Sequence, residues 1–297
     1  MMSENLFKTD HPLTASILSK LGKLLLNCCD WKISLSCLNK AYEMNKRIYK
    51  SENEKNDHIQ LSKSLSIMGD YYLKSYEFEE AYSFYNESFE MNKRMFKDNQ
   101  NHPDIADSFS NFGHYYLKNG NYNQSLVNYE KAFAINKELY ENENVRIADS
   151  LIDLGFYYLK RNDYNQASKL FNTACEMKHS LYQANLDHPE IANLHIYLGK
   201  VNLNLGDYNS SLIHFQEAYK LSKSIFHNYD KDDFAQMIKI QKNLAKAYLK
   251  TKDFKSALRN YEEALRITSN IYSNENHEEI NFINTKLGNL LKFIKYR

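Results

Sequence analysis

Glycine spacing is the feature of this sequence that most restricts how the chain can fold. Six of the eight glycines follow a large apolar residue and recur every 42 to 47 positions, with Ala245 standing where one glycine is missing. The resulting series is Gly22, Gly69, Gly113, Gly155, Gly199, Ala245 and Gly288. A period of this length and regularity indicates a repeat protein. Because repeat arrays grow by stacking, the length of 297 residues does not imply two globular domains.

Large and small residues follow each of the first six small positions in the same order. An aromatic residue stands nine positions after the small residue, and a second small residue follows three positions later. A large residue comes four positions after that, and a third small residue three positions further on. In the second repeat these residues are Phe78, Ala81, Tyr85 and Ser88. Steps of three, four and seven are helical, and large-against-small alternation lets two helices approach closely. We therefore predict that bulky side chains fill the space that each glycine leaves.

The remaining glycines and the prolines indicate where helices end and begin. Gly120 and Gly206 lie seven residues after Gly113 and Gly199, which predicts the turn between the two helices of a repeat. All three prolines follow histidine, and proline suits the first helical turn. The sequence therefore predicts that His11-Pro12, His102-Pro103 and His188-Pro189 each open a repeat.

This ladder of small and aromatic residues resembles the tetratricopeptide repeat. The proline that ends the second helix in that family is absent, so we expect a longer second helix, with pairs such as Ile48-Tyr49 and Met95-Phe96 in its last turn. A lengthened repeat that opens with His-Pro is similar to the kinesin light chain subtype. The resemblance covers residues 11–297 and implies an all-α, right-handed superhelical α-solenoid of six tandem helix pairs plus a C-terminal capping helix.

The repeat boundaries predict one continuous domain over residues 11–297 after a short polar lead at residues 1–10. The expected repeats are 11–57, 58–101, 102–144, 145–187, 188–233 and 234–279. A capping helix at 280–297 is expected to expose polar residues, namely Asn284, Lys286, Asn289, Lys292 and Lys295.

Composition narrows the function classes. Basic and acidic residues nearly cancel, 38 against 37, so the overall charge favours neither nucleic acid nor an anionic membrane surface. We find no secretory signal and no long apolar run, and we expect a cytoplasmic protein. Cys28, Cys29, Cys37 and Cys175 show no disulfide or CxxC metal spacing, so reduced thiols are expected. We predict no metal and no cofactor.

In the family, first helices line the concave groove. The groove residues that we predict are basic or amide side chains, namely Lys74, Lys118, Lys160, Lys250, His114, Lys200, Lys246, Asn111 and Asn243. A line of lysines suits an extended acidic peptide. The competing interpretation is that lysine in the last turn of a helix is favoured by the helix dipole wherever the side chain points.

These patterns favour a non-enzymatic module or scaffold that binds a protein or peptide. Catalysis is disfavoured for two reasons. Phosphate-binding loops need clustered glycines, whereas every glycine here is assigned to a helix crossing or a turn, and no Walker or G-x-S-x-G sequence is present. The alternative is a sensor or oligomerisation module of a larger signalling assembly that binds through its convex face or its ends. The sequence leaves the partner, the pathway, the oligomeric state and membership of a larger protein open.

Overall fold

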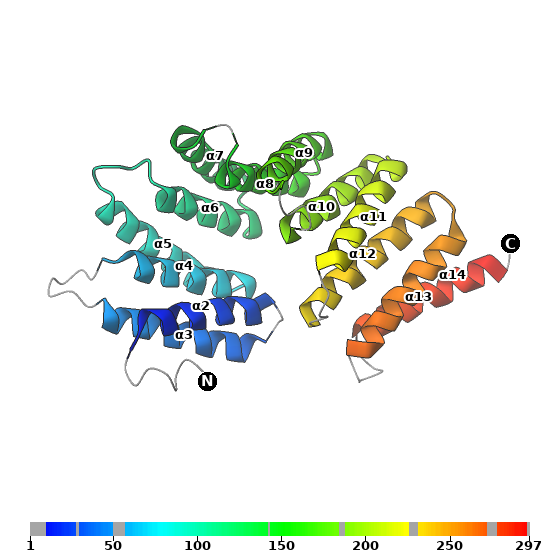
Figure 1. The fold of residues 1–297 in the computed structure, drawn as a ribbon, viewed down its shortest axis with the longest axis horizontal. Coiled ribbons are helices and arrows are strands. Elements are labelled where there is room, and N and C mark those ends of the chain that lie inside the picture. Colours follow the sequence, from blue (N-terminus) through cyan, green and yellow to red (C-terminus); the bar gives the residue numbers. More distant parts are fainter. Residues whose placement is uncertain are drawn as a thin grey trace. The chain divides into compact units, whose positions relative to one another are not determined.

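The computed structural model describes residues 10–27, 30–49, 57–141, 143–183, 188–225, 231–271 and 278–295. Within these ranges all regular secondary structure is helical, which confirms the all-α prediction (Figure 1). The lead before Asp10, together with Cys28 and Cys29, lies outside the described residues.

The chain divides into two compact units, Met1–Asn142 and Glu143–Arg297. The helices of the first unit are α2 (Pro12–Asn27), α3 (Trp31–Ile48), α4 (Ile59–Lys74), α5 (Phe78–Met95), α6 (Pro103–Lys118) and α7 (Tyr122–Leu139). Those of the second are α8 (Val145–Lys160), α9 (Tyr164–Leu181), α10 (Pro189–Leu205), α11 (Tyr208–Ile225), α12 (Lys231–Lys250), α13 (Phe254–Ile271) and α14 (Glu278–Lys295). The single continuous domain stays a prediction.

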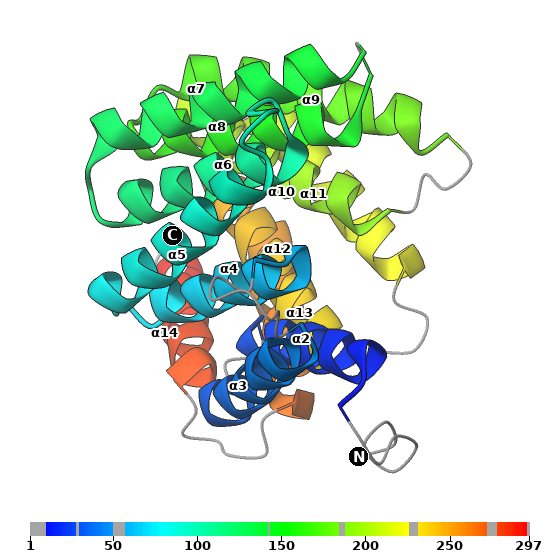
Figure 2. The same ribbon diagram turned by 90° about the vertical axis from the view of Figure 1, so that its left-hand side faces the viewer.

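Helices pair in sequence order within each unit. In the first unit α2 packs on α3, α4 on α5 and α6 on α7, and the pairs follow one another along the chain (Figure 2). First helices also contact first helices, since α4 touches both α2 and α6. In the second unit α8/α9, α10/α11 and α12/α13 are the pairs, α10 contacts α12, and α14 packs on α13. First helices therefore share a common face within each unit.

The periodic glycines lie where two helices of a pair approach most closely. A Cβ atom added to Gly113 would lie 2.4 Å from the ring of Tyr129, and one added to Gly69 would lie 2.6 Å from the ring of Tyr85. Gly22, Gly155 and Gly199 are covered in the same way by Leu38, Phe171 and Phe215. The prediction that bulky side chains fill these spaces is therefore confirmed for the five glycines that lie on the first helix of a described pair.

The turn between paired helices contains one residue with a left-handed backbone. Gly120 (φ 81°) and Gly206 (φ 84°) occupy this position, as predicted. The equivalent residues of three other repeats are not glycine but still have positive φ, namely Tyr76 (65°), Asn162 (60°) and Lys252 (63°). The turn geometry is thus retained even where the side chain makes it unfavourable.

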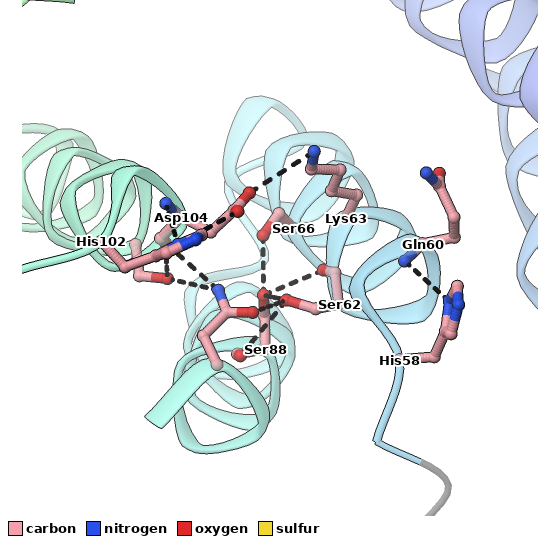
Figure 3. Close-up of polar contacts among 10 residues, drawn as sticks. His58, Gln60, Ser62, Lys63, Ser66, Ser88, His102 and Asp104 are labelled. Carbon is pink, nitrogen blue, oxygen red and sulfur yellow. Dashed lines mark hydrogen bonds and ion pairs between the residues drawn. The ribbon is translucent and has the colours of Figure 1, made fainter. Parts of the chain in front are cut away.

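Histidine caps the first helix of several repeats. The Nδ1 atom of His58 accepts a hydrogen bond from the N–H of Gln60 (3.2 Å), and His102 accepts one from Asp104 (3.2 Å; Figure 3). His188 does the same with Glu190 at 3.3 Å. In the fourth repeat Asn144 replaces histidine and caps α8 through Oδ1. These acceptors satisfy backbone donors that the helix itself leaves unpaired.

Each of these three histidine rings also stacks on an aromatic residue that ends the preceding second helix. The ring centroids are 3.5 Å apart for Tyr49 and His58, 3.5 Å for Phe96 and His102, and 4.0 Å for Tyr182 and His188. The aromatic residues predicted for the last turn of the second helix therefore join consecutive repeats.

A polar residue is buried between consecutive pairs, twenty-three positions after each small residue. The equivalent residues are Asn45, Asn92, Asn136, Lys178, Ser222 and Thr268. Asn92 Oδ1 accepts a hydrogen bond from Ser62 (2.6 Å), and Asn92 Nδ2 donates to Ser108 (3.0 Å). Ser62 and Ser66 of α4 also bond to Ser88 of α5, as Figure 3 shows.

In the fourth repeat this position holds a lysine whose side chain is 0% exposed. Lys178 Nζ on α9 lies 2.7 Å from Asp149 Oδ1 on α8 and 2.6 Å from Glu190 Oε2 on α10. Burial alone would lower the pKa of Lys178, but the hydrogen bonds to the two carboxylates outweigh burial and raise it. The ammonium is therefore kept charged inside the helix stack and joins three consecutive helices.

The last helix, α14, buries Ile280, Ile283, Leu287 and Leu290. The five polar residues predicted for its outer face are exposed, and so are the apolar residues Leu291 and Ile294. Among the helices described, none combines the length and the apolar character that a membrane crossing requires.

Candidate partner-binding surface

In the first unit, the predicted groove lysines lie at the ends of first helices. Lys74 is the exposed last residue of α4, and Lys118 is the last residue of α6. Lys118 Nζ donates to the carbonyl of Leu73 (2.8 Å) and to that of Lys74 (3.4 Å). It also lies 4.0 Å from the ring centroid of Tyr76. Burial and the charge of Lys74 lower the pKa of Lys118. Lys118 of α6 therefore already stabilises the C-terminal end of the neighbouring helix α4.

The other two predicted residues of this unit are partly buried. His114 Nδ1 shares a hydrogen bond of 2.7 Å with the hydroxyl of Tyr129, whose ring covers Gly113. In the preceding repeat, Tyr85 donates to Asp70 in the same way at 2.8 Å. The position after the glycine thus holds the covering tyrosine in place. Asn111 lies on α6, near the middle of this helix.

In the second unit, Lys160 is exposed at the end of α8. Asn243, predicted to offer its amide to a ligand, is 7% exposed, and within the described residues its Nδ2 has no hydrogen-bond partner. The side chain of Asn243 is therefore buried rather than exposed. Phe156 of α8 packs edge-on against Tyr197 of α10 with ring centroids 4.7 Å apart.

The remaining predicted lysines belong to one basic cluster on α10 and α12, which we call the α10–α12 lysine cluster. Its members are Lys200 of α10 and Lys239, Lys242, Lys246 and Lys250 of α12. Lys239 and Lys242 were not named from the sequence, and they lie six and three residues before Ala245.

Electrostatic repulsion within the cluster is evident in its pKa values. Burial, followed by the charges of Lys239 and Lys246, lowers the pKa of Lys200 to about 8. Burial also lowers the pKa of Lys246, and the charges of Lys242 and of Lys286 on α14 lower it further, whereas Glu279 raises it. Lys242 forms an ion pair with Glu279. No carboxylate within the described residues forms such a pair with Lys200, Lys239, Lys246 or Lys250.

A pocket of about 490 Å³ adjoins this cluster. Lys246 and Lys250 line it from α12, and Asn204 and Gly206 line it from the end of α10. Leu203, Leu205, Tyr208 and Leu249 supply its apolar surface. The pocket therefore combines two ammonium groups and an amide with apolar walls, a combination suited to a segment that carries both carboxylates and apolar side chains.

Comparison with known proteins identifies the repeat. Family models of the tetratricopeptide repeat match residues 104–180 and 240–279. These two segments are tetratricopeptide repeats. Both matched segments contain the glycine or alanine positions from which the tetratricopeptide repeat was inferred. A search of curated proteins gives no match to this chain.

Solved structures with similar folds include BtubC (BKLC) from P. vanneervenii, with a TM-score of 0.64 and 19% identity over 81% of this chain and 92% of that one. The TPR-like repeats of a candidate kinesin light chain from Podosopora anserina give 0.57 and 15% over 72% and 98%. The apo form of RapI gives 0.53 and 16% over 95% and 99%. At these identities the similarity concerns the fold, which is the tetratricopeptide-repeat solenoid.

Proposed function

We propose that this protein is a non-enzymatic interaction module of the cytoplasm that binds an acidic segment of a protein partner on the α10–α12 lysine cluster. The supporting observation is the lowered pKa of Lys200 together with the absence, within the described residues, of carboxylates paired with four of the five lysines. In this function the first helices, which carry these lysines, line the concave groove in which the partner binds.

The ammonium groups of the cluster favour a ligand that carries carboxylates. Holding several ammonium groups together costs free energy, and a ligand that places carboxylates among them removes that cost. Asn204 can bond the backbone of an extended segment, while Leu203 and Leu249 accept an apolar side chain. Because each exposed charge pair contributes about 0–1 kcal/mol, we expect micromolar affinity.

The test uses a defined probe, a fluorescent peptide of alternating Glu and Leu, and compares it with a Gln and Leu peptide. Lys200→Gln combined with Lys246→Gln should weaken binding of the acidic peptide about tenfold, measured by fluorescence anisotropy. The matched control is Lys169→Gln with Lys255→Gln, which removes the same charge from α9 and α13 and should leave binding unchanged. High salt should weaken the wild-type complex.

Equal loss in the two double variants would mean that only net charge matters and would reject the site. Equal affinity for the two peptides would reject the acidic ligand. Unchanged affinity for the acidic peptide at high salt would show that charge attraction does not hold the complex together.

A second candidate function is supported by exposed apolar residues on terminal helices. On α2, Leu13, Ile17, Leu21 and Leu24 are all at least 40% exposed, and on α14 Leu291 is 51% exposed. Such surfaces suit association through the ends, as expected of a sensor or oligomerisation module. If this function holds, Leu291→Lys combined with Ile294→Lys should lower the sedimentation coefficient of the purified protein. An unchanged coefficient would exclude association through α14.

A further inference from the structure

Four side chains of types that bind metals, one cysteine and three histidines, gather on three consecutive helices of the second unit. Cys175 and His179 are one turn apart on α9, and His195 lies on α10. One donor atom of each lies within 4.8 Å of the donors of the other two. The Nδ1 atom of His214 on α11 is 3.0 Å from Nδ1 of His195.

The donor set fits a borderline transition metal. Zn²⁺ binds thiolate sulfur and imidazole nitrogen at about 2.0–2.3 Å in tetrahedral sites, which places ligand atoms about 3.3–3.7 Å apart. The three donors therefore need side-chain shifts of about an ångström to reach that geometry. Oxygen-seeking cations such as Mg²⁺ and Ca²⁺ are disfavoured, because the group contains no carboxylate.

Burial favours the neutral form of two of these histidines, His195 and His214. Burial, followed by the neighbouring His214 and His179, lowers the pKa of His195 to about 4, although Glu217 raises it slightly. Burial also lowers the pKa of His214. The imidazole of His195 is therefore neutral near pH 7 and has a lone pair to donate. Burial raises the pKa of Cys175 to about 11, so metal binding releases the thiol proton to solvent.

We propose that Cys175, His179 and His195 bind a transition-metal ion of the Zn²⁺ class, while His214 hydrogen-bonds to His195 and orients its ring. The fourth coordination position is left to water. A second-shell partner of this kind commonly fixes the tautomer of a ligating histidine. The bound ion links α9 of one helix pair to α10 of the next, and its binding therefore stabilises the contact between the fourth and fifth repeats.

This inference revises the sequence-based expectation of no metal, and it does not depend on the proposed function. The ligands come from two helices, α9 and α10, and are separated by up to twenty positions, so no linear CxxC or HExxH pattern marks them. The one local signal is the spacing of four residues between Cys175 and His179, which places both side chains on the same face of α9.

The experiment uses the full chain after removal of any affinity tag and treatment with a chelator. Zn²⁺ alone is titrated by calorimetry, and Co²⁺ is titrated by absorption, since a thiolate-to-cobalt charge-transfer band identifies sulfur as a ligand. We expect one ion per chain with submicromolar affinity, the charge-transfer band, and a higher Tm in the presence of Zn²⁺. Cys175→Ser should abolish the band, and His195→Gln should weaken affinity at least tenfold.

The controls are Cys37→Ser, which removes a buried thiol on α3, and His11→Gln, which removes a histidine of the first unit. Both should bind Zn²⁺ and Co²⁺ as the wild type does. His214→Gln should weaken binding less than His195→Gln, because His214 only orients a ligand. Absence of the band, or equal affinity in the wild type, Cys175→Ser and His195→Gln, would overturn the proposal and indicate an adventitious ion only.

Discussion

At five glycines of this chain, the two helices of a pair lie so close together that a Cβ atom would not fit. The covering side chain is a leucine, a tyrosine or a phenylalanine, and it contacts the glycine directly. Gly288 is different, because a Cβ atom added there meets nothing within 4 Å. The same residue type at equivalent repeat positions therefore has opposite consequences for substitution.

Gly113→Ala should destabilise the protein by about 1–3 kcal/mol, because the new Cβ would force the ring of Tyr129 to move. Gly288→Ala should instead stabilise it by about 1 kcal/mol, since alanine is the better helix former and space is available. The midpoints of urea unfolding measure both effects. Opposite signs are expected for the two variants, and a loss of stability in both would contradict this explanation.

A second residue-scale prediction concerns the left-handed turn position. Lys252 is exposed and has a φ of 63°, which costs a non-glycine residue about 1 kcal/mol. Lys252→Gly should therefore raise the urea midpoint, by up to about 1 kcal/mol in unfolding free energy. Lys255→Gly, within α13, is the control and should lower it. If both variants lower the midpoint, the turn is not strained.

At the scale of the helices, the histidine caps explain why repeats open as they do. The sequence predicted that His-Pro begins a repeat from the preference of proline for the first turn. The structure adds that the imidazole accepts a backbone N–H while its ring stacks on the end of the preceding helix. A neutral Nδ1 is required for the first of these roles.

Stability should consequently depend on pH through His58. Burial lowers the pKa of His58 below its ordinary value of 6.5. The stabilising contribution of a group with a lowered folded pKa is complete above the unfolded value, and it is lost as pH falls through the folded value. His58→Asn keeps the cap acceptor without titrating, as Asn144 does. As pH falls from about 7 to about 5, the Tm of the wild type should therefore decrease relative to that of the variant. A constant difference would contradict the neutral cap.

Lys178 contacts α8 and α10 from α9, so substitutions of Lys178 test what holds these three helices together. Lys178→Ala should cost about 2–4 kcal/mol, because the fully buried stem and its hydrogen bonds are removed. Lys178→Met should stay within about 1 kcal/mol of the wild type, since an apolar group of similar volume also removes the buried charge. Thermal unfolding monitored by circular dichroism distinguishes them. Equal losses would show that the ion pairs themselves hold α8, α9 and α10 together.

At the scale of the whole molecule, the proposed binding of acidic peptides should depend on pH. The pKa of Lys200 is about 8, so most of its charge is lost by pH 9. Binding that uses this ammonium should weaken about tenfold between pH 7 and pH 9. In Lys200→Arg the charge persists over this range, and the pH dependence should be much smaller. Fluorescence anisotropy with the Glu and Leu peptide measures both, and identical profiles would exclude Lys200 from the site.

The sequence predicted the architecture because the repeat pattern is local. The glycine ladder, the turn at Gly120 and Gly206 and the helix starts at His102 and His188 all depend on residues within one repeat. Contacts between repeats were not predictable in this way. Nothing near Lys178 in the sequence indicates Asp149 or Glu190, and the burial of Asn243 follows from packing rather than from its position in the motif.

The candidate site was predicted in part. Lys200, Lys246 and Lys250 lie in the basic cluster, whereas Lys118 is engaged with the end of α4. The last-turn position alone could not separate these cases, because dipole compensation and ligand binding select the same residue type.

Lys178 pairs with one carboxylate of its own helix pair, Asp149, and with one of the next pair, Glu190. This arrangement limits how the array can be rearranged by duplication, deletion or recombination. A copy of the fourth repeat placed beside a different neighbour would contain a buried ammonium without Glu190, a costly defect in a low-dielectric environment. The units of this array are therefore not interchangeable at that junction, and the order of the fourth and fifth is constrained by charge as well as by shape.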